Sequence, residues 1–261
     1  MYELENDAEA SRLEKQALQE NYSLPDELRF LKIKPGMKIL DAGCGSGLLC
    51  KFLSEKYSDQ NIHLTGFDFS ETRVRQAEDN LKKSGYVNIK IEHQNLEMIK
   101  HEDNQFDLII CRFVIEHLEN PIKAITELKR ILRPNGVLYL IDLDGVWVNT
   151  YTQNIKFNQM MRKIENELNV DFIVGRKMAG MMSLAGLKSI NWDVTHHTFK
   201  DDQLKLEYEN NKERCEMLMP RLISILGSES EARYFKDTFL TEMLKPETAI
   251  FHSKFIVRGT K

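Results

Sequence analysis

Residues 37–47 combine three features that could bind a ligand: a short apolar run, an acid at its end, and three alternating glycines. The stretch reads Met-Lys-Ile-Leu-Asp-Ala-Gly-Cys-Gly-Ser-Gly. Glycine has no Cβ, so such a loop can turn tightly and bring its backbone close to a ligand. Asp41, before the loop, suits a ligand with positive charge, such as an ammonium or a sulfonium. We therefore expect this loop to bind a partly cationic ligand.

The loop stands between two elements that would hold it in place. The apolar run before it predicts a buried parallel strand, and Leu48, Leu49, Phe52 and Leu53 after it predict a helix to about Tyr57. A strand, a glycine loop and a helix form the nucleotide site of doubly wound α/β sheets. A dinucleotide fingerprint would place its third glycine where this chain has Leu48. The pattern is therefore G-x-G-x-G, preceded by an acid.

A second acid follows at the spacing that this site requires. Residues 62–68 predict the next strand, which ends in Asp68, 21 positions beyond Gly47. An acid in that place accepts hydrogen bonds from the ribose hydroxyls of a bound nucleoside, and charge-assisted bonds of this kind are strong. The alternative is an acid that only favours the dipole of the next helix. The glycine loop upstream favours the ribose interpretation.

The segment Leu40-Asp-Ala-Gly-Cys-Gly-Ser-Gly47 resembles motif I of the class I S-adenosylmethionine-dependent methyltransferases. The downstream run Phe106-Asp…Glu-His-Leu-Glu-Asn-Pro…Leu-Arg-Pro-Asn-Gly-Val-Leu138 is similar to later motifs of the same family, in the same order. The resemblance implies an α/β fold with a Rossmann-like seven-stranded sheet, mostly parallel with the last strand antiparallel, and helices on both faces. It also implies a methyltransferase domain over residues 36–261, preceded by an N-terminal helical cap over 1–35. Helical insertions are expected at about 146–172 and 201–246.

The resemblance also assigns expected roles to site residues. The methionine end of S-adenosylmethionine would lie against Asp41 and the loop Gly43, Cys44, Gly45 and Gly47. The ribose would bind Asp68, and the adenine would bind Phe69, Asn95 and Leu96. Backbone carbonyls of Cys111 and Arg112 would receive the ammonium, and Arg12 and Gln16 of the N-terminal segment are further candidates. His117, just after the fourth strand, is the candidate general base, although a structural role in its loop is the alternative.

Hydrophobic periodicity predicts the remaining elements. Helices are expected up to residue 34, from Ser70 to Gly85, and over 121–132, 154–168 and 175–185. A further helical stretch is expected over 201–246, with an apolar stripe that includes Leu204 and Leu206. Strands are expected over 88–95, 106–112, 137–142, 189–199 and 249–257. The last of these would run antiparallel between the fifth and sixth strands, as in the family.

Composition excludes several classes of function. The net charge of −4, from 36 basic and 40 acidic residues, does not favour a nucleic-acid partner. No apolar stretch approaches the roughly 20 residues of a membrane span, and the acidic N-terminus is unlike a signal peptide. The four cysteines show no paired spacing, so we expect reduced thiols in a cytoplasmic protein, with no metal site.

The sequence therefore predicts an S-adenosylmethionine-dependent methyltransferase that acts by in-line displacement. Its partner would be a small-molecule acceptor, an apolar or aromatic metabolite, because adaptable methionines and aromatic residues gather in the first insertion. The helical insertions are also candidates for a homodimer interface. Two alternatives remain: a non-catalytic S-adenosylmethionine-binding regulatory module, and a nicotinamide-dependent dehydrogenase, which Leu48 and Asp41 disfavour.

Overall fold

The computed structural model describes residues 22–86, 89–150 and 152–261. The chain divides into two compact units. We call residues 23–142, 174–194 and 255–261 the sheet unit, and residues 143–173 and 195–254 the helical unit. Each unit is described by itself.

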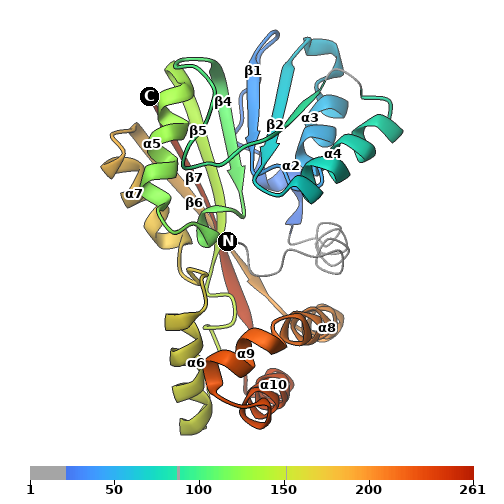
Figure 1. The fold of residues 1–261 in the computed structure, drawn as a ribbon, viewed down its shortest axis with the longest axis vertical. Helices are drawn as coiled ribbons and strands as arrows, with labels where there is room; N and C mark the ends of the chain where they lie inside the picture. The colour runs from blue at the N-terminus through green and yellow to red at the C-terminus, as the bar shows by residue number, and fades with distance from the viewer. Residues whose placement is uncertain (1–21, 87–88, 151) are drawn as a thin grey trace. The chain divides into compact units, whose positions relative to one another are not determined.

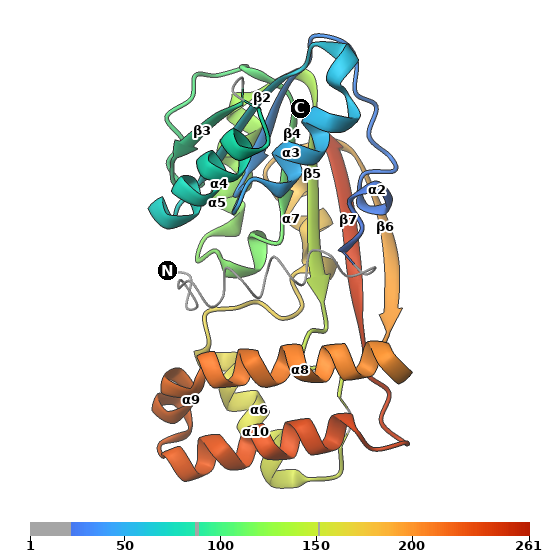
Figure 2. The same ribbon diagram turned by 90° about the vertical axis from the view of Figure 1, so that its right-hand side faces the viewer.

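Among the described residues, seven strands form one sheet in the order β3-β2-β1-β4-β5-β7-β6 (Figure 1). The strands are β1 (Lys38–Ala42), β2 (His63–Asp68), β3 (Lys90–His93), β4 (Phe106–Arg112), β5 (Leu132–Asp144), β6 (Lys188–Thr198) and β7 (Phe251–Thr260). The first five pair in parallel, and β7 runs opposite to β5 and β6 (Figure 2). The antiparallel last strand therefore lies between the fifth and sixth, as predicted.

Helices cover both faces of the sheet because alternate side chains of each strand point to opposite faces. Leu40, Ile109 and Leu138 pack in one core with helices α5 (Pro121–Ile131) and α7 (Met178–Leu184). Their neighbours Ile39, Leu108 and Tyr139 pack in the other core. That second core includes α2 (Leu24–Glu27) and α3 (Leu48–Lys56), while α4 (Glu71–Lys83) contributes to a smaller cluster. The predicted α/β class is confirmed.

Local signals explain where several helices begin and end. The Ser70 hydroxyl accepts a hydrogen bond from the Arg73 N–H at 3.3 Å, so it caps α4 as expected. Gly85, with φ +82°, follows the end of that helix. Short 3₁₀ turns connect other elements, at η2 (Ser58–Gln60), η3 (Ile115–His117) and η4 (Gly175–Lys177).

Two predictions about the sheet unit are wrong. The predicted helix does not continue to residue 34, because α2 ends at Glu27. The residues that follow are irregular chain, from which Leu28, Leu31 and Ile33 pack against the core. Strand β5 begins at Leu132 rather than Val137. It extends because Leu132 pairs with Phe106 across an irregularity in the β4–β5 ladder.

The helical unit has its own apolar core. It contains α6 (Ile155–Glu167), α8 (Asp201–Met217), α9 (Met219–Leu226) and α10 (Glu229–Met243). Phe157 and Phe235 stack with ring centroids 5.2 Å apart at the centre of this core. The expected apolar stripe of α8 is wrong at Leu206, which is 56% exposed, whereas Glu207, Asn210 and Asn211 of the same helix are buried.

Candidate functional site

The glycine loop joins the end of β1 to α3 and is tied to β2. Gly43, Gly45 and Gly47 have φ angles of +82°, +52° and +81°, a region that residues with a Cβ rarely adopt. The backbone N–H groups of Gly43 and Cys44 both donate to the carbonyl oxygen of Phe67, at 2.8 Å each. The loop is therefore fixed to the end of the neighbouring strand.

The three glycines serve two different purposes. A Cβ at Gly43 would lie 2.4 Å from Cγ2 of Val114, and a Cβ at Gly47 would lie 3.2 Å from Cβ of Ala77. These two positions need glycine partly because the protein itself packs against them. A Cβ at Gly45 would meet nothing within 4 Å. Gly45 therefore borders open space, where a ligand can approach the backbone.

Asp68 faces this loop from the end of β2. One carboxylate oxygen accepts from the Gly45 N–H at 2.9 Å, and the other accepts from the Ser70 N–H at 3.0 Å. The side chain is partly exposed, and the adjacent Phe69 is 51% exposed. Asp68 is thus held in a defined orientation beside Gly45.

Asp41 is buried behind the loop. Its carboxylate accepts from the Cys50 thiol at 3.5 Å. Burial raises the pKa of Asp41 to about 7, although the Cys50 hydrogen bond and the charge of Arg112 lower it. A carboxylate in this environment is stabilised by a cation that enters the site.

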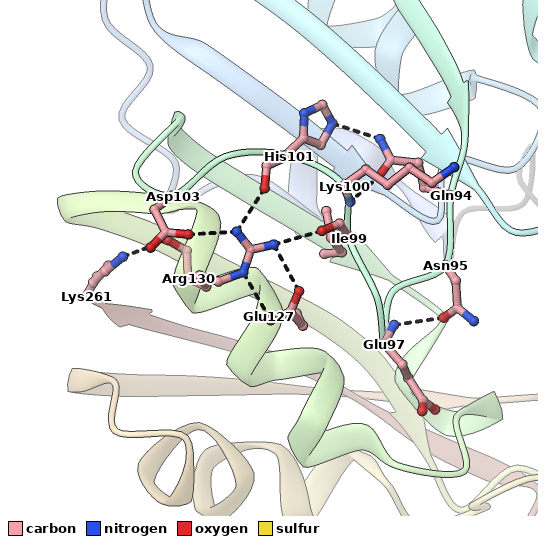
Figure 3. A network of polar contacts seen from close by, with 10 residues as sticks. All are labelled: Gln94, Asn95, Glu97, Ile99, Lys100, His101, Asp103, Glu127, Arg130 and Lys261. Atoms are coloured by element: carbon pink, nitrogen blue, oxygen red, sulfur yellow. Dashed lines mark hydrogen bonds and ion pairs between the residues drawn. The ribbon is translucent and has the colours of Figure 1, made fainter.

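The predicted adenine loop follows β3. Leu96 is buried in the core of the sheet unit, whereas Asn95 is exposed. The Asn95 amide oxygen accepts from the backbone N–H of Glu97 at 2.8 Å. This interaction closes a local turn (Figure 3). Asn95 therefore directs its amide nitrogen away from the turn.

Arg130 of α5 anchors the same loop, and the sequence pattern gave no sign of this role. Its guanidinium donates to the backbone carbonyls of Ile99 and His101, at 2.8 Å each (Figure 3). It also pairs with Asp103 at 2.8 Å and with Glu127 at 2.9 Å. One side chain therefore fixes the course of the segment that follows Asn95 and Leu96.

The end of β4 holds a buried ion pair that was also not predicted. The Arg112 guanidinium contacts the Glu27 carboxylate through two nitrogens, at 2.5 and 3.3 Å, and Glu27 is fully buried. Their separation of 85 residues leaves no local signal in the sequence. The preceding residue, Cys111, is fully buried, and burial together with the charges of Asp142, Asp41 and Asp68 raises the pKa of its thiol well above the ordinary value. Acidic groups of several strands therefore gather at this end of the sheet.

His117 lies in η3, directly after β4. Its Nε2 is 3.4 Å from a carboxylate oxygen of Glu116, whose backbone N–H donates to Asp142 at 3.2 Å. Asp142, near the end of β5, is fully buried. The loop that carries His117 is thus fixed to β5, and its role as a general base stays a prediction.

The structure brings most of the predicted site residues to one edge of the sheet. Asp41, Asp68 and Arg112 stand at the carboxyl ends of β1, β2 and β4, which are neighbours in the parallel part of the sheet. Arg12 and Gln16 lie outside the described residues. Among the residues that are described, no group of three acids, histidines or cysteines could hold a metal ion, and no helix has the length and apolar character to cross a membrane. All four cysteines are buried free thiols, as expected.

A family model described as a methyltransferase domain matches residues 33–213. The chain belongs to this family. The matched range begins before β1 and extends into α8, so it includes the glycine loop, Asp68 and the predicted adenine loop after β3.

Known proteins agree with this assignment. The chain is 36% identical over 113 residues to a ubiquinone biosynthesis O-methyltransferase of Pasteurella multocida, across 40% of this chain and 45% of that protein. It is 26% identical over 117 residues to a demethylmenaquinone methyltransferase of Listeria welshimeri, across 45% and 49%. The match thus spans about half the length of these curated relatives.

A solved structure resembles the whole chain. It is a Haemonchus contortus phosphoethanolamine N-methyltransferase 2 in complex with phosphomonomethylethanolamine and S-adenosylhomocysteine. Its TM-score is 0.63 at 15% identity, and the match covers 98% of this chain and 57% of that one. At this identity the likeness shows a shared fold.

Proposed function

We propose that this protein is an S-adenosylmethionine-dependent methyltransferase that acts on a small apolar or aromatic acceptor. The observation that carries the proposal is the pairing of Asp68 with the glycine loop. The Gly45 N–H fixes the Asp68 carboxylate beside the open space at the same glycine, so acceptor oxygens and bare backbone lie next to each other. This arrangement suits a ribose better than an isolated acid would.

The remaining residues fit the two ends of this cofactor. Asp41, a buried acid with a raised pKa, would be stabilised by the positive charge of the methionine part. Phe69, exposed beside Asp68, would cover one face of the adenine, and Asn95 with the backbone of Leu96 would bind its edge. When bound, S-adenosylmethionine supplies a methyl group on a sulfonium, already activated for in-line displacement.

The chain's own contribution would be to orient the acceptor and exclude water. His117 would accept a proton if the acceptor's nucleophile is protonated near neutral pH. The curated relatives are both named after quinones, which supports an apolar or aromatic acceptor. We also propose the helical unit as the place of a homodimer interface, which light scattering of the purified chain would test.

Calorimetric titration with S-adenosylmethionine and with NAD tests the cofactor. We expect saturable binding of S-adenosylmethionine and none of NAD. Asp68→Ala should weaken the binding at least tenfold, because the variant loses both ribose acceptors. Asp79→Ala, an exposed acid on α4, is the matched control and should bind as the native chain does. Unchanged affinity of Asp68→Ala would refute the pocket assignment.

A second experiment tests the reaction itself. Incubation with radiolabelled S-adenosylmethionine and a panel of hydroxylated aromatic compounds should transfer label to at least one of them. Binding of the cofactor without any transfer, across such a panel and a metabolite extract, would instead favour the regulatory module.

A further inference from the structure

Within the sheet unit, a positive charge lies on the same face of the sheet as Asp41. In the β1–β4 ladder Asp41 pairs with Ile110, and Arg112 stands two residues beyond Ile110 on the same strand. Paired residues of neighbouring strands, and residues two apart on one strand, point to the same face of a sheet. The guanidinium charge also acts on the carboxylate, since it lowers the pKa of Asp41 against the larger effect of burial.

Glu27, the last residue of α2, holds this guanidinium. Its carboxylate accepts from Nε of Arg112 at 2.5 Å and from Nη2 at 3.3 Å. The Glu27 side chain is fully buried, whereas that of Arg112 is 15% exposed. The Tyr139 hydroxyl donates to the backbone carbonyl of Glu27 at 2.7 Å and so fixes the end of the short helix. The ion pair therefore has a defined geometry on the face of the sheet that α2 and α3 cover.

This pairing decides the sign of the charge at the carboxyl end of the sheet. A guanidinium without a counter-charge would make the electrostatic potential near Asp41 more positive, and charges act strongly where water is excluded. Glu27 supplies the opposite charge at hydrogen-bond distance. Asp41, Asp68 and Asp142 all raise the pKa of the Cys111 thiol, so acidic groups surround the same place. With the Arg112 charge offset, the potential there is negative.

Methyl transfer changes the charge of the cofactor. S-adenosylmethionine carries a sulfonium, and its sulfur becomes a neutral thioether in S-adenosylhomocysteine once the methyl group has left. The ribose, the adenine, the ammonium and the carboxylate are the same in both. A negative potential at the methionine end therefore favours the methylated form over the product, and a more positive potential would reduce that preference.

We propose that Glu27 is a positioning residue that offsets the charge of Arg112 and thereby lets the site prefer the sulfonium cofactor over its neutral product. The inference rests on the proposed function, because that function puts the methionine end of the cofactor beside Asp41. The effect of Glu27 passes through Arg112 and requires no contact between Glu27 and the cofactor.

Calorimetric titration of the full chain with S-adenosylmethionine and with S-adenosylhomocysteine tests this role. The quantity of interest is the preference ratio, the dissociation constant of S-adenosylhomocysteine divided by that of S-adenosylmethionine. In Glu27→Gln the guanidinium loses its counter-charge, so the ratio should fall by about tenfold. The double variant Glu27→Gln with Arg112→Gln removes both charges and should return the ratio to near its native value.

Further variants separate charge from stability. Breaking a buried pair is destabilising, so thermal unfolding of each variant should accompany the titrations. Glu27→Asp keeps the charge and should keep the ratio even where stability falls. Asp107→Asn, which removes an acid from the pair with Arg133 at the start of β4, is the matched control and should keep the native ratio. Arg112→Gln tests the other partner, and its ratio should equal or exceed the native one even if Glu27→Gln does not fold.

The possible outcomes distinguish the inference from the proposed function. Equal weakening of both ligands in Glu27→Gln, or a lower ratio in Arg112→Gln, would overturn the inference and leave the pair with a structural role only. Such a result in a chain that still binds S-adenosylmethionine would leave the proposed function intact. A native chain that bound neither ligand would refute the proposed function, and the inference with it.

Discussion

At the scale of single residues, the site combines a carboxylate that is costly to ionise, Asp41, with one that backbone N–H groups hold in place, Asp68. Asp41 is buried, and its pKa is raised to about 7 from an ordinary value of 3.8. Asp68 is partly exposed and bonded to two backbone N–H groups. The first acid would gain most from a cationic ligand, whereas the second offers a fixed pair of acceptors to neutral hydroxyls. The two carboxylates thus suit different ends of one ligand.

Asp41→Asn should stabilise the fold in a pH-dependent way. Because the folded state binds the Asp41 proton more tightly than the unfolded state does, its contribution to stability is lost as pH rises from about 4 to about 7. The amide side chain of the variant does not ionise, so the variant does not lose stability in this way. We expect the variant's advantage in free energy of unfolding to grow over that window and to level off above it, on the order of 4 kcal/mol for a shift of about three pKa units.

Thermal unfolding at several pH values measures this effect. The exposed Asp79→Asn variant should show no such trend. A constant difference between Asp41→Asn and the native chain across pH would contradict the burial argument. Calorimetry of the same variant should show weaker S-adenosylmethionine binding, because an amide cannot balance a cation.

The glycines of the loop offer a second test at this scale. Gly43→Ala should destabilise the fold by about 2–3 kcal/mol, because its Cβ would collide with Val114 at a strained φ. Gly45→Ala meets open space and should cost only about 1 kcal/mol of strain. That methyl group would nevertheless occupy the space of the ligand, so cofactor affinity should fall at least tenfold.

Chemical denaturation and calorimetry distinguish the two variants. Adding Val114→Ala to Gly43→Ala should recover part of the lost stability. If Gly45→Ala bound the cofactor normally, the open space at this glycine would not be part of the ligand site.

At the scale of elements, the sequence predicted those parts of the fold that follow from local patterns. Alternating apolar residues and helix caps located α4, α5 and the strands of the sheet to within a few residues, apart from the start of β5. Motif order supplied the predicted site residues. Long-range pairs left no such signal. The ion pair between Glu27 and Arg112 and the Arg130 anchor join distant segments, so neither spacing nor periodicity could reveal them. Helix α8 was misread because its buried face is polar and its Leu206 is exposed.

Arg130→Lys tests whether the anchor positions the adenine loop. A lysine cannot reproduce the forked contacts to Ile99, His101 and Glu127. We expect a loss of about 2 kcal/mol in stability and a several-fold loss of affinity for adenosine. Arg133→Lys, which affects a pair with Asp107, is the control and should leave adenosine binding unchanged. Equal adenosine affinities in both variants would show that Arg130 acts on stability alone.

At the scale of the whole molecule, the family match and the division into units do not coincide. The methyltransferase model matches residues 33–213, which leaves α9, α10 and β7 outside it. The helical unit is built partly from these unmatched helices, α9 and α10. Features that this chain shares with its family are therefore expected to bind the cofactor, and features outside the match are expected to select the acceptor.

Hydrogen exchange of the full chain gives this division a direct test. S-adenosylmethionine should slow exchange at 41–47, 68–70 and 95–97, all in the sheet unit, because its binding would order those loops. A compound that the chain methylates should instead slow exchange in parts of the helical unit, if that unit selects the acceptor. If that compound protected only the sheet unit, acceptor selection would belong to the sheet unit, and the helical unit would need another role.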